Sequence, residues 1–332
     1  MIHIAPLADN RSRRLPFYLA MEEWIARSLP PDEYFFAWAV APTVICGRNQ
    51  DMAAEVDMAY CKAHSIDVVR RKSGGGCVYA DPDNLMLSHI TPSEHVTTTF
   101  SRYTAMVARA LQAYGLDAQA NGRNDILIGD RKVSGNAFYH LPGRSIVHGT
   151  LLCDIDMERM LRAITPAKAK LESKMVKSVE SRVTCIREHK PEATIEQVRQ
   201  HLISTLTSGE ITLTPQQVKE IEAIEAQYYT REWMEGRKLR PAARTMRKDT
   251  RIDGIGLFSS RLALNNDGRI ADAALFGDFF TVADTAEVLD RIKGLTAQQA
   301  ADALMASNAA SAVPSLSKEQ LVEVLGLTTT TN

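Results

Sequence analysis

The sequence predicts an α/β (α+β) protein in which a mixed, largely antiparallel sheet is flanked by helices, with a small α+β domain at the C-terminal end. Three observations support this fold class. Apolar residues recur at helical spacing over residues 17–29, and β-prone runs follow one another at hairpin spacing between residues 125 and 153. The composition becomes strongly basic near residue 240, before a second set of strands begins. A chain of 332 residues can form one large and one smaller domain.

The first half of the chain alternates between these two periodicities. In chain order the expected elements are a helix at 17–29, strands at 34–40 and 43–46, a helix at 53–64, strands at 66–69, 77–79 and 84–90, a helix at 97–114, and strands at 125–128, 132–139 and 145–153. The strands at 66–69 and 77–79 flank a glycine-rich turn, which we interpret as the loop of a hairpin. This part of the chain should supply most of the large sheet.

The second half is predicted to be mainly helical until a short hairpin near the end. Thr194 with Gln197 and Thr214 with Gln217 have the spacing of capping boxes at helix N-termini. Strands at 252–264 and 269–276 should flank a turn, with helices at 285–293, at 296–306 and after Ser317. The expected domains are therefore 1–243 for the large domain, 244–251 for a basic linker, and 252–332 for the small C-terminal domain.

Composition excludes several classes of partner. The chain is 45% hydrophobic and 24% charged, with a formal net charge of −1, so no overall field favours nucleic acid or membranes. Its five cysteines are dispersed without a CxxC pair, which is typical of reduced thiols in a cytoplasmic protein. No secretory pattern and no apolar run of about 20 residues is present. We expect a cytoplasmic protein with no nucleic-acid or membrane partner.

The most informative motif is Arg70-Arg71-Lys72-Ser73-Gly74-Gly75-Gly76-Cys77-Val78-Tyr79. Three successive glycines let the backbone approach a ligand closely and present its N–H groups. Guanidinium groups beside them suit phosphate oxygens. The motif indicates an anion cradle, although a flexible loop with solvated charges accounts for the loop alone equally well.

Two further clusters lie on the predicted hairpins. In a regular strand Lys132 and Ser134 point to the same face, and the lysine could neutralise a phosphate or an acyl carbonyl oxygen, or simply be solvated. His148 and Gly149 interrupt an otherwise apolar strand, where a single histidine is either a core residue or a catalyst. Asn124 and Asp125 supply turn chemistry at the start of the preceding strand.

Taken together, these clusters resemble the lipoate–protein ligase family. The carrying motifs are Arg-Arg-x-Ser-Gly-Gly-Gly-x-Val-Tyr at 70–79, Gly-Arg-Asn-Asp-Ile at 122–126, Lys-Val-Ser-Gly-Asn-Ala at 132–137 and His-Gly-Thr-Leu-Leu at 148–152. A later run at 177–184 also matches, and the resemblance spans nearly the whole chain. It implies the biotin/lipoate ligase (class II synthetase-like) catalytic fold with a small accessory domain.

The resemblance also implies an activity. Lipoate and ATP would give lipoyl-AMP, whose lipoyl group would pass to a lysine on lipoyl domains of 2-oxoacid dehydrogenase E2 subunits or on the glycine-cleavage H protein. Mg²⁺ would accompany ATP, with metal ligands left open, and Lys132 would be catalytic, bridging the acyl carbonyl and the α-phosphate. The loop at 168–184 matches the family's adenylate-binding loop. The implied site residues are Arg70, Arg71, Ser73, Gly74, Gly75, Gly76, Cys77, Val78, Tyr79, Asn124, Asp125, Lys132, Ser134, Gly135, His148 and Gly149.

Some features leave alternatives open. Ala80 and Asp83 replace a histidine and a glycine that are usual in the family, so the preference for lipoate over octanoate is undecided. A cysteine-dependent octanoyl or lipoyl transferase would need Cys77 or Cys153 as its nucleophile. A non-catalytic lipoate-binding protein is a further alternative, against which Lys132 argues. The basic residues at 237–251 are either a solvated linker or a docking patch for acidic lipoyl domains.

Overall fold

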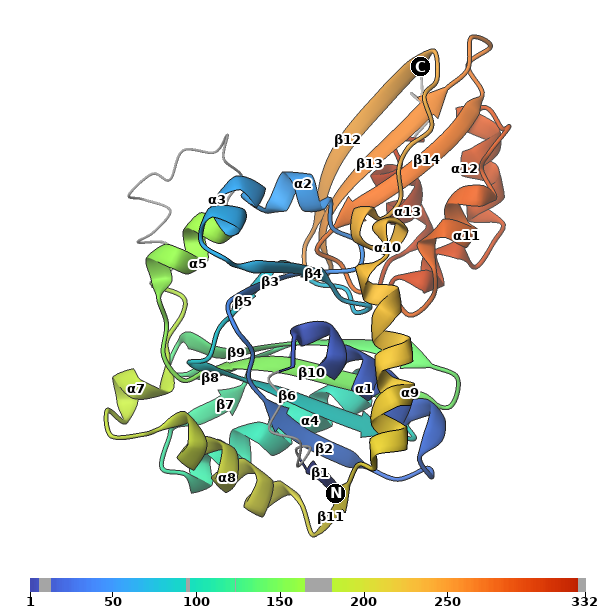
Figure 1. The fold of residues 1–332 in the computed structure, drawn as a ribbon. Coiled ribbons are helices and arrows are strands. Elements are labelled where there is room, and N and C mark those ends of the chain that lie inside the picture. The colour runs from blue at the N-terminus through green and yellow to red at the C-terminus, as the bar shows by residue number, and fades with distance from the viewer. Residues whose placement is uncertain (6–12, 94–95, 123, 165–180, 328–332) are drawn as a thin grey trace. The chain divides into compact units, whose positions relative to one another are not determined.

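The computed structural model describes residues 1–5, 13–93, 96–122, 124–164 and 181–327. The chain forms two compact units (Figure 1). The first comprises Met1–Cys46, Ala53–Arg71 and Val78–Thr230, and the second comprises Gly47–Met52, Lys72–Cys77 and Arg231–Asn332. The second unit therefore combines the C-terminal region with two short loops from the N-terminal half. The boundary expected at residue 243 stays a prediction.

A mixed, largely antiparallel sheet of eight strands forms the centre of the first unit, as predicted. Its order is β11-β1-β2-β6-β10-β9-β8-β7, with only the β11–β1 and β1–β2 pairs parallel. The strands are β1 (Ile2–Ala5), β2 (Tyr34–Trp38), β6 (Asn84–Thr91), β7 (Ala118–Ala120), β8 (Asp125–Ile128), β9 (Arg131–Leu141), β10 (Arg144–Leu152) and β11 (Gly209–Thr212). β6 and β10 are buried along nearly their whole length. Strands β1, β7 and β11 were not predicted, because runs of three or four residues are too short to show a clear alternation.

Helices cover both faces of this sheet. On one face lie α1 (Leu15–Ser28), whose first turn contains Pro16, and α9 (Pro215–Glu225). On the other face α4 (Val96–Ala113) and α8 (Ile195–Leu206) pack, with Phe100 of α4 5.5 Å from Phe138 of β9 between ring centroids. Both predicted capping boxes are confirmed, at the N-termini of α8 and α9. The sheet thus lies between two helical layers (Figure 1).

Smaller helices complete the first unit. The single helix predicted at 53–64 is wrong: α2 (Met52–Glu55) and α3 (Met58–Ala63) are separate. The break occurs because the Asp57 side chain accepts a hydrogen bond from the Tyr60 backbone N–H and so caps a new helix. The others are α5 (Met157–Ala163), α7 (Ile186–His189) and the 3₁₀ helix η1 (Ala226–Tyr229).

A second, three-stranded sheet holds the flanks of the glycine-rich motif. Its order is β4-β3-β5, made of β3 (Thr43–Cys46), β4 (Asp67–Arg70) and β5 (Val78–Ala80). The hairpin interpretation is therefore wrong, because β4 and β5 each pair with β3, which lies between them. With strands about 4.8 Å apart, the glycine-rich loop has to span about two such spacings, beyond the reach of a two-residue turn.

The second unit contains a three-stranded antiparallel sheet with helices. The strands are β12 (Arg244–Ile252), β13 (Gly256–Leu264) and β14 (Ile270–Gly277), and the helices are α10 (Arg231–Glu235), α11 (Thr285–Asp290), α12 (Ala297–Met305), the 3₁₀ helix η2 (Ala309–Ala312) and α13 (Lys318–Val324). Phe258 and Phe279 stack in its core with centroids 4.4 Å apart. The segment expected as a basic linker at 244–251 is instead the edge strand β12. Its basic side chains are tolerated there because most of the strand is exposed.

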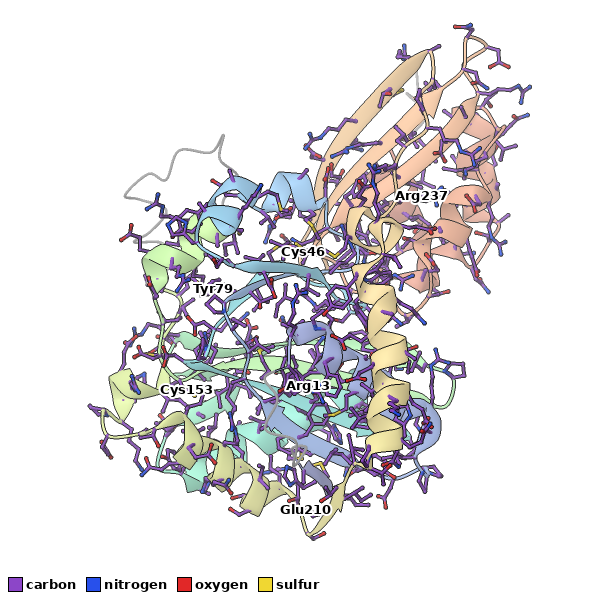
Figure 2. The ribbon with its side chains drawn as sticks, viewed as in Figure 1. Arg13, Cys46, Tyr79, Cys153, Glu210 and Arg237 are labelled. Carbon is purple, nitrogen blue, oxygen red and sulfur yellow. The ribbon has the colours of Figure 1, made fainter. Side chains whose placement is uncertain are left out.

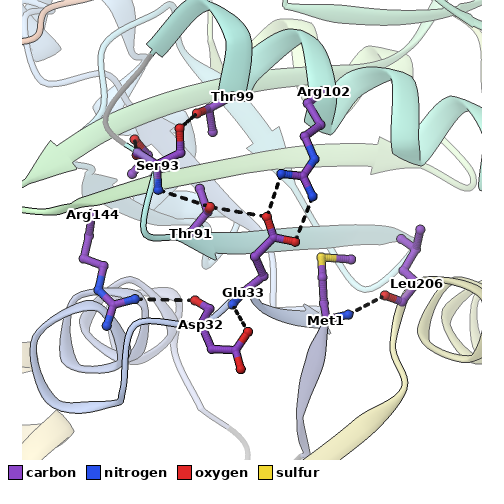
Figure 3. Close-up of polar contacts among 10 residues, drawn as sticks. Met1, Asp32, Glu33, Thr91, Ser93, Thr99, Arg102, Arg144 and Leu206 are labelled. Atoms are coloured by element: carbon purple, nitrogen blue, oxygen red, sulfur yellow. Dashed lines mark hydrogen bonds and ion pairs between the residues drawn. The ribbon is translucent and has the colours of Figure 1, made fainter.

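Polar contacts tie together one end of the large sheet (Figure 3). Glu33, just before β2, pairs with Arg102 of α4 at 2.9 Å. Arg144, at the start of β10, donates to the backbone carbonyl of Leu29 at 2.8 Å. These contacts join the ends of α1, β2 and β10 to α4 at one place. Among the described residues, no helix is both long and apolar enough to cross a membrane.

His89 of β6 is buried in the first unit with neither ring nitrogen hydrogen-bonded to a described residue. Its ring stacks on Tyr103 of α4 at 5.9 Å. Burial, aided by the nearby Arg102 charge, lowers the pKa of His89 to about 4. The folded protein therefore keeps this ring neutral under conditions in which the unfolded chain would protonate it.

A pH-dependent loss of stability follows from His89. In the unfolded chain His89 binds a proton below about pH 6.5, whereas in the folded protein it does so only below about pH 4. The contribution of His89 to stability is therefore complete above pH 6.5 and is lost as the pH falls from 6.5 to 4. We expect His89 to account for about 3 kcal/mol of that loss. Urea unfolding at several pH values should show a shallower pH dependence for His89→Phe than for the wild type. Parallel curves would contradict this origin.

Candidate active site

A β-bulge determines where Lys132 points. Ile126 and Leu127 are neighbours on β8, yet they pair with Ser134 and Lys132 on β9, so the buried Val133 is an extra residue. A bulge interrupts the strict alternation of side chains. The expectation that Lys132 and Ser134 share a face is therefore wrong, and Lys132 points to the face of Gly135.

The Lys132 ammonium lies directly over Gly135. A Cβ on that glycine would lie 2.6 Å from both Cε and Nζ of Lys132. Lys132 Nζ is also 2.7 Å from Asp125 Oδ1 on the neighbouring strand, and the two side chains are 37% and 22% exposed. A lysine held in this way remains accessible to a ligand while its position is restricted.

The opposite face of the same strands carries a buried polar group. Asn136 Nδ2 donates to the Asn124 backbone carbonyl at 2.9 Å, and Ser134 Oγ donates to Asn136 Oδ1 at 3.3 Å. Gly149 pairs with Asn136 across β9 and β10, and any Cβ there would collide with the Asn136 amide. These contacts hold the turn at Asn124, which leads into Asp125.

His148 belongs to a buried chain of hydrogen bonds. Its Nδ1 lies 2.9 Å from Glu22 Oε2 of α1, and Glu22 is fully buried. Ser88 Oγ donates to Glu22 at 2.6 Å, and Trp38 Nε1 donates to Ser88 at 2.9 Å. His148 is therefore a paired core histidine on the face of the sheet that α1 covers.

The flanks of the glycine-rich motif are anchored in the first unit. Arg71 donates its backbone N–H to Cys46 and a guanidinium N–H to Ile45, both at 2.9 Å, and Arg70 is also buried. Val78 and Tyr79 form β5, and burial raises the pKa of Tyr79 to about 12.

The middle of the motif belongs to the second unit. A Cβ on Gly74 would collide with the backbone of Phe279 and Phe280, whereas Gly75 has φ +88°, a conformation that favours glycine. Gly75 N–H and Asn49 Nδ2 approach the Phe279 carbonyl at 3.4 and 3.3 Å. A Cβ added to Gly76 would lie 3.9 Å from the Asp278 Cβ, an ordinary van der Waals distance, so Gly76 is not required by crowding. Packing against the strand end at 277–280 thus explains why Gly74 carries no side chain.

The turn that departs from the family pattern is built on Asp81. Asp81 Oδ1 accepts from the Asp83 backbone N–H and from Asn84 Nδ2, both at 3.0 Å. Burial raises the pKa of Asp81. Asn84 Oδ1 is buried without a hydrogen-bond partner among the described residues. This turn leads directly from β5 into β6.

Seven of the predicted site residues lie on, or directly before, the adjacent strands β8, β9 and β10, although on both faces of the sheet: Asn124, Asp125, Lys132, Ser134, Gly135, His148 and Gly149. Ser73, Gly74, Gly75, Gly76 and Cys77 lie in the second unit. Residues 165–180 of the predicted adenylate-binding loop, and Arg123, fall outside the described residues. The predictions missed Glu22 and the contacts of Arg131, for which no sequence motif gives a signal.

Some of the basic residues at 237–251 form ion pairs with acidic residues of the second unit. Arg237 pairs with Asp272 and Asp290, Lys238 with Glu235, and Arg247 with Asp249. Lys248 donates to the Glu323 carbonyl at 2.6 Å. These four of the seven basic residues at 237–251 have internal partners, so a docking patch there stays a prediction.

Comparisons with known proteins identify the family of both parts of the chain. Residues 15–207 match the family model "Lipoyl protein ligase A/B catalytic domain", and residues 242–325 match "Bacterial lipoate protein ligase C-terminus". Lipoate–protein ligase 1 of Staphylococcus aureus is 35% identical over 87% of this chain and 89% of its own. The lipoate-protein ligase LplJ of Bacillus subtilis is 32% identical over 96% and 98%.

Solved structures show the same fold. LipL1 of P. falciparum, solved with lipoate, superposes with a TM-score of 0.75 at 18% identity over 98% of both chains. A bipartite lipoate protein ligase of Thermoplasma acidophilum, solved in work that includes its E2 lipoyl domain, gives 0.64 at 26% over 72% of this chain and 98% of its own. A lipoate-protein ligase A bound with ATP gives 0.61 at 25% over 71% and 98%.

The fold and the matched catalytic domain define the class of protein, a lipoyl ligase with a separate C-terminal domain. The chain belongs to the lipoate–protein ligase family. The named relatives that establish this membership are lipoate–protein ligases, so the chain is an enzyme of this ligase type.

Proposed function

We propose that this protein activates lipoate with ATP and transfers the lipoyl group to a lysine of a protein acceptor. In the first step a lipoate carboxylate oxygen attacks the α-phosphorus, the bond to the β-phosphate breaks, and pyrophosphate leaves. In the second step the lysine amine attacks the acyl carbonyl, an amide forms, AMP leaves and the amine loses a proton. The observation that carries the proposal is the Lys132 ammonium, held by Asp125 above a glycine in a matched ligase domain.

The site residues support this chemistry. Phosphoryl attack by a carboxylate depends mainly on orientation and on positive charge near the developing oxyanion. Lys132 would bridge the acyl carbonyl and the α-phosphate, and Arg70 and Arg71 of the same unit would hold the nucleotide. Support for the substrates comes from a lipoate-protein ligase A bound with ATP and from a protein of T. acidophilum with bound lipoic acid, each 25% identical to this chain.

Mg²⁺ would be held with the nucleotide phosphates. Mg²⁺ in nucleotide sites commonly takes only one or two protein carboxylates, with phosphate and water completing its shell. Asp125 fits this role: its Oδ1 is buried and, although 2.7 Å from Lys132 Nζ, makes no aligned hydrogen bond. The bound ion would neutralise phosphate charge. Among the described residues, no cluster of three or more acidic, histidine or cysteine side chains suggests an all-protein metal cage.

The acceptor we propose is a lipoyl domain of an E2 subunit or a glycine-cleavage H protein, and the expected location is the cytoplasm. The archaeal relative described with its E2 lipoyl domain supports an acceptor of this kind. The test is ATP–pyrophosphate exchange that requires lipoate, followed by transfer to each purified acceptor. Absence of lipoate-dependent exchange would reject the proposed first step, whereas exchange without transfer would reject only the acceptors.

The cysteine-dependent alternative makes a different prediction for Cys153. This thiol is buried directly after β10, at the position labelled in Figure 2, and burial raises its pKa to about 12. A thiol with so high a pKa is a poor nucleophile near pH 7. We expect Cys153→Ala to retain ATP-dependent lipoylation within about twofold, measured by the label it incorporates into a lipoyl domain. Loss of activity in this variant, together with acylation by an acyl-carrier protein without ATP, would contradict the ligase mechanism.

A further inference from the structure

Residues 182–184 bind the backbone of Lys132. The Lys132 N–H donates to the Arg182 carbonyl at 2.8 Å, and the Thr184 N–H donates to the Lys132 carbonyl at 2.9 Å. Val183 and Lys132 thus form a parallel bridge. β8 occupies one edge of β9 here, and pairing with β10 extends only as far as Ser134. Residues 182–184 therefore complete the other edge of β9 at Lys132.

Arg131 joins this bridge to the helix that follows it. Its Nη1 lies 2.7 Å from Glu188 Oε2 of α7 and donates to the Val183 carbonyl at 3.4 Å. Thr184 and Ile186 are buried, and Thr184 Oγ1 is 2.8 Å from His189 Nε2. The residue that precedes Lys132 is thus attached to a segment that is itself anchored in the first unit.

This ion pair has little to contribute to stability. The Arg131 and Glu188 side chains are 35% and 43% exposed, and pairs exposed to this degree are usually worth about 0–1 kcal/mol. Its geometry matters more, because the bulge at Val133 disrupts the ladder beside Lys132 on the β8 side. The two hydrogen bonds to residues 182–184 therefore restrain the Lys132 backbone, and with it the position of the ammonium group.

We propose that Arg131 and Glu188 are positioning residues for Lys132, holding residues 182–184 against its backbone so that its ammonium meets the reacting oxygens. The inference rests on the proposed function, since it assigns Lys132 to adenylate formation. Displacing a catalytic group by about 1 Å can cost up to about 100-fold in rate. Loss of the Arg131–Glu188 pair should therefore lower kcat for adenylate formation about tenfold or more, with nearly unchanged KM values for ATP and lipoate.

The test compares Arg131→Ala and the nearly isosteric Glu188→Gln with a control on the same segment. Arg187→Ala removes a similar pair, Arg187–Asp154 at 2.7 Å with side chains 44% and 40% exposed, which does not touch Lys132. The full-length variants are assayed by lipoate-dependent ATP–pyrophosphate exchange, and each thermal midpoint is measured. Arg187→Ala should stay within about twofold of the wild type, because its loss affects only segment anchoring and surface pairs contribute little.

A double-mutant comparison separates positioning from a general structural role. If Arg131 acts through Lys132, Arg131→Ala should cause no further loss when added to Lys132→Ala. The inference would be overturned if Glu188→Gln lowered kcat less than fivefold, or if Arg187→Ala lowered it as much as Glu188→Gln. It would also be overturned if Arg131→Ala lowered kcat as strongly in the Lys132→Ala background as in the wild type. A wild type without lipoate-dependent exchange would instead reject the proposed function itself.

Discussion

Replacing Lys132 with alanine is expected to slow lipoate-dependent adenylate formation by about 100- to 1,000-fold, the usual effect of removing one preorganised oxyanion partner. The variant loses the charge that Asp125 holds above Gly135, whereas the proposed nucleotide-binding residues Arg70 and Arg71 are untouched. KM for ATP should therefore change much less than kcat. ATP–pyrophosphate exchange with lipoate and with octanoate gives both constants, and their ratio also reports the acyl preference.

Stability provides the control for this experiment. The Lys132–Asp125 pair is partly exposed, so its loss should change the free energy of unfolding by no more than about 1 kcal/mol. Lys190→Ala is a suitable matched variant, because Lys190 also holds a fixed position, donating to the Tyr114 carbonyl at 2.9 Å, but on another part of the unit. Exchange by Lys132→Ala within tenfold of the wild type would remove this lysine from the catalytic step.

The largest expected effect on stability comes from Glu22→Ala. This substitution leaves His148 Nδ1 and the Ser88 hydroxyl without their shared partner in the core. Breaking a buried charged or strongly polar pair typically costs about 3–5 kcal/mol, because the remaining group stays desolvated. We expect a loss near the lower end of that range, measured by urea unfolding of the full-length protein.

The chain supplies its own control for this prediction. His3 and Glu210 also form a histidine–glutamate contact, at 3.1 Å, but the Glu210 side chain is 61% exposed. Glu210→Ala should cost less than about 1 kcal/mol, since water replaces the lost partner. Similar losses in the two variants would mean that burial of the Glu22–His148 contact is not what determines its energetic weight.

Much of the fold was predictable because it depends on local periodicity. The long helices, the strands of the two central hairpins and both capping boxes follow from residue spacing alone. What could not be predicted depends on pairing with distant residues. β3 lies between β4 and β5, which converts an apparent hairpin into a loop over the end of a strand. Strand β12 could not be recognised from the sequence, because its mostly exposed residues have the basic composition expected of a linker.

The candidate site also has features that local motifs predict and features that depend on pairing with distant residues. Lys132, Asp125 and Gly135 were identified by their motifs, and the structure brings them into contact. The direction of Lys132 was not predictable, since the bulge at Val133 exists only in the pairing of β8 with β9. The contacts of Arg131 with Val183 and Glu188 join segments about 50 residues apart and leave no trace in local spacing.

Membership of the glycine-rich loop in the second unit has a consequence for how this family can be recombined. That unit is assembled from three separate stretches of chain, so a cut after Thr230 would divide it rather than release it. A chimaera taking residues 231–332 from one relative and the rest from another would set a foreign strand end against Gly74 and Asn49. Grafts that exchange Gly47–Met52 and Lys72–Cys77 along with the C-terminal region would keep these interlocking surfaces matched.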